Sequence, residues 1–250
     1  MKSDLSIPKL TVKREIDSIS GEMDVHYYWE SKLSPKVELI GKPVDKLSGY
    51  TLIKKDLDNS LNWIRVAEKL SNNAYDTNEV VKEHSQVYQV AKDREISDHI
   101  KAYFVASLTF YGKCFTNANG RHAQVARDWL DLEHQQLHDY FMKYRHNFAA
   151  HSGDEHIELA KTFVLLHPNK KILLPYLPTA RLQPDVVLTS SKGEKGLAEL
   201  IEYVSIIVVE RYNKLSDKII NEFILTHDME FWHTAIDNGK PVIVKFSHSS

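Results

Sequence analysis

The stretch from Tyr144 to Ser152, with the sequence Tyr-Arg-His-Asn-Phe-Ala-Ala-His-Ser, lies where a long helical pattern stops. Before it, apolar residues recur every three to five positions, at Val125, Trp129, Leu132, Leu137, Phe141 and Tyr144. This spacing predicts a helix from about residue 121 to about residue 150, with Gly153 as its C-terminal cap. The stretch therefore brings an arginine and two histidines to the end of a helix.

Three helical patterns precede this one. The first runs from Asp58 to Leu70, and the second begins near Asp76 and continues to about Val90. The third, over residues 100–115, is rich in aromatic residues and nearly free of charge, which is typical of a central helix. Proline and glycine interrupt the first 55 residues, so we expect an irregular N-terminal segment there.

The chain changes character after residue 161. Two short apolar runs, Thr162–Leu166 and Lys171–Leu174, flank a Pro-Asn turn and predict a β-hairpin. A second long helix is predicted over residues 194–225, with either a break near Ser216 and Asp217 or a partner packed along it. A final strand, residues 241–246, is expected beside the hairpin.

These patterns together predict a mainly α fold. An irregular segment, residues 1–55, precedes a helical core over residues 56–160. Residues 161–250 add the small β-hairpin, the long C-terminal helix and the last strand, all packed on the core. The fold class is therefore a helical bundle with a small β addition.

Composition limits the classes of function. The formal net charge is −2, so no global positive field attracts nucleic acid, and a polyanion must bind at a local patch. Cys114 is the only cysteine, which excludes a disulfide within the chain. No apolar run approaches the roughly 20 residues that a membrane span needs. We expect a cytoplasmic protein without a membrane segment, and its sequence contains no glycine-rich phosphate loop.

Arg145 and His151 are the candidate catalytic pair. An arginine is a permanent cation whose forked donors match phosphate oxygens, and a histidine transfers protons near neutral pH. Together they can cleave a phosphodiester without a metal. Six residues of regular helix place the two side chains roughly 120° apart around the axis. They converge only if the helix ends between them or if a second subunit completes the site.

The motif Arg145–His151 resembles the Arg-x-His motif of the HEPN superfamily, in which four to six residues separate the two. The upstream residues Tyr111–Phe115, Gly120–Arg121 and His138 also resemble a group of uncharacterised bacterial HEPN-like proteins. The resemblance covers about residues 97–160. It implies a homodimer and metal-independent endoribonuclease activity on RNA, in a toxin–antitoxin or phage-defence setting with an antitoxin or other protein partner. It implies no cofactor.

The resemblance also implies roles for single residues. Arg145 and His151 would be catalytic, and Asn147, or less readily His146, would be the auxiliary polar residue. Ser152 could add a hydrogen bond. Some HEPN domains are catalytically silent, so the alternative is a non-catalytic module that binds a protein or a nucleotide, with residues 194–225 docking the partner.

Two further interpretations stay open at this point. Arg145 could instead pair with a carboxylate such as Asp139, Asp154 or Glu155, leaving His151 as an ordinary helix-end histidine. His134 and His138 have the i, i+4 spacing of paired zinc ligands, but no metalloprotease glutamate follows His134. We therefore predict no metal site, and expect His138 to pack or hydrogen-bond near the motif.

Overall fold

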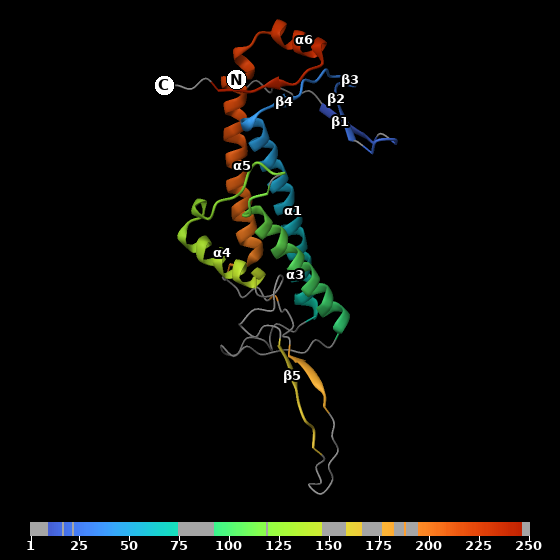
Figure 1. Ribbon diagram of the computed structural model, residues 1–250, viewed down its shortest axis with the longest axis vertical. Helices are drawn as coiled ribbons and strands as arrows, with labels where there is room; N and C mark the ends of the chain where they lie inside the picture. Colours follow the sequence, from blue (N-terminus) through green and yellow to red (C-terminus); the bar gives the residue numbers. More distant parts are fainter. Residues whose placement is uncertain are drawn as a thin grey trace, which may run out of the picture. The chain divides into compact units, whose positions relative to one another are not determined.

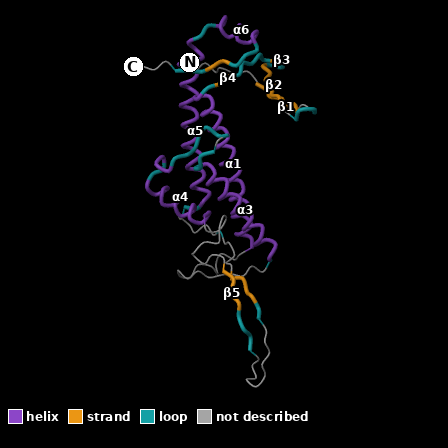
Figure 2. Tube along the Cα trace, viewed as in Figure 1, coloured by secondary structure: helices purple, strands orange, loops and turns teal. Residues whose placement is uncertain are grey.

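The computed structural model describes residues 10–16, 18–21, 23–74, 93–118, 120–146, 159–166, 177–182, 188 and 195–246. The described part is mainly helical, as predicted (Figures 1 and 2). The chain divides into two compact units: one is residues 46–214, and the other combines residues 1–45 with residues 215–250. No helix in the described part of the chain is long and apolar enough to cross a membrane.

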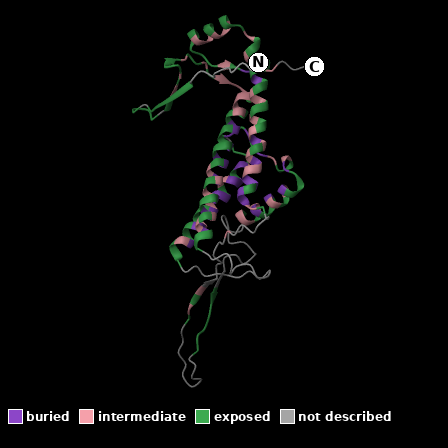
Figure 3. Cartoon of the chain, turned by 180° about the vertical axis from the view of Figure 1, so that it is seen from behind, coloured by how far each residue is buried: buried purple, intermediate pink, exposed green. Residues whose placement is uncertain are grey.

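The larger unit is built on α1 (Lys42–Ala74), α3 (Arg94–Cys114) and α5 (Leu197–Glu222), which lie side by side (Figure 1). Their buried residues gather in the middle of this helical part (Figure 3). Small serines bring α1 and α3 together, because Ser60 Oγ donates to the Ser107 carbonyl at 2.7 Å and Ser107 Oγ donates to the Ser60 carbonyl at 2.8 Å. An ion pair between Arg65 and Glu202 connects α1 to α5.

The predicted irregular segment, residues 1–55, is wrong for most of its described part. Helix α1 begins at Lys42 and not near Asp58. Pro43 lies in its first turn, where the missing backbone N–H has no helical acceptor to lose. An antiparallel sheet precedes α1 and consists of β1 (Leu10–Ile16), β2 (Met23–Trp29) and β3 (Lys32–Leu33).

The predicted helix over residues 121–150 is also wrong in its first part. After α3 the chain forms an extended loop with one short 3₁₀ turn, η1 (Arg127–Trp129), and α4 covers only Leu132–Tyr144. The Asp131 carboxylate caps α4 by accepting the His134 backbone N–H at 2.9 Å. Val125 lies in the loop and its side chain is buried there, so its spacing from the later apolar residues did not indicate a helix.

The other boundaries differ more modestly. Helix α3 starts at Arg94, capped by the Asp93 carboxylate, which lies before the predicted start at residue 100. A hairpin is present, but its paired strands are β5 (Leu159–Thr162) and β6 (Thr179–Leu182), so Thr162–Leu166 was placed too far along the chain. The predicted strand Lys171–Leu174 and the helix predicted over residues 76–90 lie outside the described residues.

Helix α5 runs without the predicted break near Ser216 and Asp217. Its side chains Val204 and Val208 are buried in the core of the chain itself. The docking face predicted for residues 194–225 is therefore wrong at these two positions, because they already pack within this chain. An aspartate at either position would therefore disrupt folding.

The smaller unit contains the three-stranded sheet and a second pair of strands. β4 (Leu39–Ile40) pairs in parallel with β7 (Val242–Ile243), so the last strand lies beside β4 and not beside the hairpin as predicted. Between α5 and β7 lie η3 (Ile224–Thr226) and α6 (Met229–Asn238). Asp228 caps α6, and Gly239, at a φ of 61°, ends it.

Candidate functional site

The structure describes only part of the predicted site. Arg145, His146 and His138 lie within the described residues. Asn147, His151 and Ser152 lie outside the described residues, and so does the distance between Arg145 and His151. The described part of the site is the end of α4 and the helix against which it packs, α3.

Arg145 is the C-terminal cap of α4, and its backbone N–H donates to the carbonyls of Phe141 and Met142. Arg145 and His146 form a wider, π-type turn, a distortion that is frequent at functional sites. The regular α-helix thus ends at Tyr144, directly before Arg145. The Arg145 side chain is half-buried, whereas His146 is exposed.

The Arg145 side chain lies directly against Gly112 of α3. A methyl group at Gly112 would come within 2.7 Å of Arg145 Nε and 3.1 Å of Cζ, and nearer still to Cδ. No side chain other than hydrogen leaves room for the arginine at this point of the helix surface. Gly112 therefore has a local role, which is to let the arginine cross α3 at close range.

Asp139, one predicted partner of Arg145, is occupied by another arginine. Arg127 Nε donates to Asp139 Oδ1 at 2.8 Å, and Arg127 Nη2 donates to Asp139 Oδ2 at 2.6 Å. These hydrogen bonds hold the pKa of the Asp139 carboxyl below its ordinary value. The predicted Arg145–Asp139 ion pair is therefore wrong, and Asp154 and Glu155 lie outside the described residues. Among the residues that the structure describes, no carboxylate pairs with Arg145.

His138 packs and hydrogen-bonds beside the motif, as predicted. Its Nδ1 lies 2.8 Å from the Tyr111 hydroxyl, and its ring lies 4.2 Å from that of Phe115 between centroids. Burial lowers the pKa of the His138 imidazole, and burial also raises the pKa of the Tyr111 phenol. Both groups are therefore neutral at pH 7. With 6% of its surface exposed, His138 holds α4 against α3 and is not placed to touch a dissolved substrate.

Two tyrosines adjoin Arg145 on α4, and sequence reasoning missed them. Tyr140 and Tyr144 are one helical turn apart, with ring centroids 5.1 Å apart and ring planes inclined by 49°. Tyr144 also packs edge to face on Phe104 of α3, at 6.5 Å. Burial, followed by the hydrogen bond with Tyr144, raises the pKa of Tyr140 to about 12. Their i, i+4 spacing directly before an arginine was the available signal.

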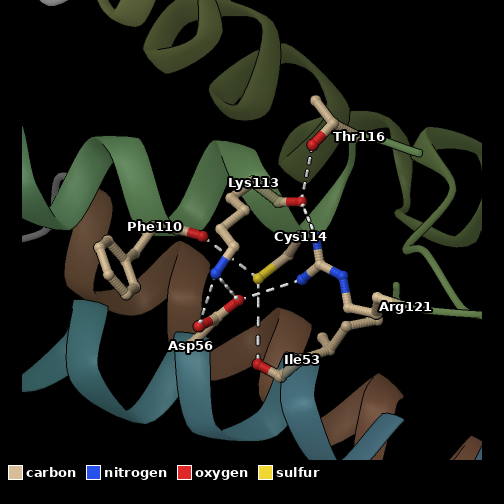
Figure 4. A network of polar contacts seen from close by, with 7 residues as sticks. All are labelled: Ile53, Asp56, Phe110, Lys113, Cys114, Thr116 and Arg121. Carbon is tan, nitrogen blue, oxygen red and sulfur yellow. Dashed lines mark hydrogen bonds and ion pairs between the residues drawn. The ribbon is translucent and has the colours of Figure 1, made fainter. Parts of the chain in front are cut away.

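A buried polar network fixes the loop that precedes α4 (Figure 4). Asp56 of α1 accepts from Arg121 Nη1 at 3.1 Å and pairs with Lys113 Nζ at 3.0 Å. Arg121 Nη2 also donates to the Lys113 carbonyl. The Cys114 thiol lies beside this network, and burial raises its pKa to about 12, so it is not a nucleophile near neutral pH.

The other end of α4 is fastened to α5. The His134 ring stacks on that of Tyr203, with centroids 3.6 Å apart and planes inclined by 3°, while its Nδ1 lies 2.8 Å from Asp131 Oδ1. The Arg211 guanidinium lies 3.5 Å above the Trp129 ring. His134 and His138 thus face different partners. Within the described ranges, no group of three or more His, Cys, Asp and Glu side chains is arranged to hold a metal ion.

Comparison with known proteins adds no relative. No family model matches the chain, and neither a curated protein nor a solved structure is significantly similar to it.

Proposed function

We propose that the end of α4 forms the phosphate-binding side of a metal-independent endoribonuclease site of the HEPN type. The supporting observation is the half-buried Arg145 guanidinium, which lies against Gly112 and has no carboxylate partner among the described residues. A partly desolvated cation with no counter-ion among the described residues favours binding an anion. The resemblance of Arg145–His151 to the HEPN motif identifies that anion as a phosphodiester of RNA.

The proposed reaction needs one acid/base group and one cation. His151 removes the proton from a ribose 2′-hydroxyl, and the 2′-oxygen attacks the adjacent phosphorus. The bond from phosphorus to the 5′-oxygen breaks, and that oxygen takes a proton from the imidazolium. The products are a 2′,3′-cyclic phosphate and a 5′-hydroxyl. Arg145 stabilises the negative charge that develops on the phosphoryl oxygens.

The proposal includes a homodimer in which the motifs of two copies line one cleft. It also keeps the cellular setting that the motif implies, a toxin or phage-defence system with a protein antitoxin. Asn147, His146 and Ser152 remain the proposed auxiliary polar residues. His138 has a supporting role, because its imidazole is bonded to Tyr111 within the α3–α4 contact.

The test is cleavage of single-stranded RNA by the full chain in the presence of EDTA. We expect His151→Ala to abolish cleavage and Arg145→Lys to reduce it strongly, because lysine cannot bind phosphate through two parallel hydrogen bonds. Circular dichroism and thermal unfolding show whether each variant keeps its fold. His122→Ala is the matched control, since His122 is an exposed histidine in the loop before α4. Equal cleavage by folded His151→Ala would overturn the proposal.

A further inference from the structure

The last two turns of α4 carry aromatic surface beside Arg145. Tyr140 is 53% exposed, although its ring is large and mostly apolar. Phe141 lies edge to face beside it, with ring centroids 5.2 Å apart, and Tyr144 lies 5.1 Å away on the next turn. The Tyr140 ring is thus held by its neighbours while part of its surface remains open to solvent.

The position of this surface relative to Arg145 is set by the helix. Tyr140 and Tyr144 are four residues apart and so share a side of α4. Arg145 follows Tyr144 directly, with the two Cα atoms about 3.8 Å apart, and points about 100° further around the axis. Tyr140 is five residues before Arg145, so its side chain lies about 140° around the axis and about 7.5 Å along it from the arginine, with Tyr144 between the two in direction.

The charges around the tyrosines suit an anionic ligand that also has a flat apolar part. Lys143 lies in the last turn of α4, and Arg145, its C-terminal cap, is a second cationic side chain. Asp139 is the nearest acidic residue on this helix, and its negative charge is balanced by the Arg127 guanidinium, which donates two hydrogen bonds to it. The Tyr140 phenol, like that of any tyrosine, is uncharged at neutral pH, so the ring does not repel a phosphate.

We propose that Tyr140 and Tyr144 form a stacking platform for an unpaired base of single-stranded RNA, on the same strand as the phosphate held by Arg145. This inference rests on the proposed ribonuclease function. Aromatic side chains stack on bases irrespective of sequence, because every base has a π face. Bases within a duplex are already stacked and paired, so the platform selects single-stranded RNA.

The test measures binding and not turnover. Full-length His151→Ala protein, which the proposed mechanism makes inactive, is titrated against a fluorescently labelled 12-nucleotide oligouridine and the change in anisotropy is followed. Adding Tyr140→Leu should weaken binding roughly 5- to 150-fold, the range expected for losing one stacked base. Tyr140→Phe, which keeps the ring, should bind within about twofold of the parent. Leucine preserves apolar cover, and the exposure of Tyr140 makes a folding defect easy to exclude by thermal unfolding.

Two further probes separate stacking from charge. Tripolyphosphate has phosphates but no base, so its competition should be weakened by Arg145→Ala and unchanged by Tyr140→Leu. Fully paired RNA of the same length should likewise bind Tyr140→Leu and its parent equally. Unchanged oligouridine affinity in Tyr140→Leu would overturn the platform, as would an absence of any RNA binding.

The two proposals fail in different ways. Suppose that RNA cleavage requires His151 but not Tyr140, and that Tyr140→Leu binds oligouridine as tightly as its parent. This result would refute the platform and leave the ribonuclease proposal intact. Binding that depends on the Tyr140 ring, without cleavage in EDTA, would refute the ribonuclease and support the platform.

Discussion

Replacing Gly112 with alanine should displace Arg145 while leaving the fold intact. The added methyl group would lie 2.7 Å from Arg145 Nε and 3.1 Å from Cζ, which is inside van der Waals contact. The arginine is the end of a flexible side chain, whereas Gly112 belongs to the backbone of α3, so the arginine must move. We expect it to rotate away from α3 and out of its half-buried position.

The effects on stability and on activity should differ greatly in size. Alanine is up to about 1 kcal/mol more favourable than glycine in a helix. Moving Arg145 to a poorer rotamer costs about 0.5–1.5 kcal/mol. The two nearly cancel, so the free energy of unfolding should change by less than about 1 kcal/mol. A displacement of about 1 Å in a catalytic group can lower the rate on the order of 100-fold.

The assay is kcat/KM for single-stranded RNA in EDTA, with urea unfolding in parallel. In an Arg145→Ala background, Gly112→Ala should cause no further loss of activity, because there is no arginine left to displace. Gly49→Ala is the matched control: its methyl group would meet the Ala123 backbone nitrogen at 2.8 Å, which cannot swing away. That variant should lose about 1–3 kcal/mol of stability. Full activity in folded Gly112→Ala would refute the role of the Arg145 position.

Three further predictions concern the scaffold around α4. Arg121→Met leaves the buried Asp56 carboxylate with only the half-exposed Lys113 as a partner, so the free energy of unfolding measured in urea should fall by about 3–5 kcal/mol. Adding Asp56→Leu should restore most of this stability. An additive loss in the double variant would contradict the pairing. Burial lowers the pKa of His138 below the ordinary value of about 6.5, so the unfolded chain takes up this proton first. The free energy of unfolding should be highest above about pH 6.5 and should fall as the pH drops through the pKa of His138 in the folded protein. In a plot of melting temperature against pH, His138→Gln should flatten this fall. An unchanged slope would exclude His138 as its cause. Since burial raises the pKa of Cys114 to about 12, its thiol should react with a disulfide reagent at pH 8 only in denaturant, and rapid labelling of the native protein would contradict the burial.

Local sequence patterns determined the helical class and the main helices. The aromatic, nearly uncharged run of residues 100–115 predicted a central helix, and α3 is buried at Ile100, Leu108 and Tyr111. The periodicity over residues 194–225 predicted α5, and the apolar runs after residue 161 predicted a hairpin. These elements are accessible from sequence because helical and strand periodicity reports which face of a segment is buried.

Tertiary packing decided where the elements begin and end. Val125 fits a helical stripe, yet its backbone N–H donates to the Cys114 carbonyl at 2.9 Å from an extended loop. That loop is held by the buried Arg121–Asp56 ion pair, whose two residues come from distant parts of the chain. Periodicity cannot distinguish a buried residue of a loop from one of a helix, because burial is all that it records.

Tertiary packing also decided the surroundings of Arg145. Its sequence position placed it near a helix end, but Asp139 was an equally reasonable partner until the loop brought Arg127 to that carboxylate. In the same way, His134 and His138 share a helical spacing but bond to Asp131 and Tyr111, on different neighbours. The close approach of Arg145 to Gly112 joins residues on separate helices. Such pairings depend on how helices pack, and no local pattern in either helix encodes them.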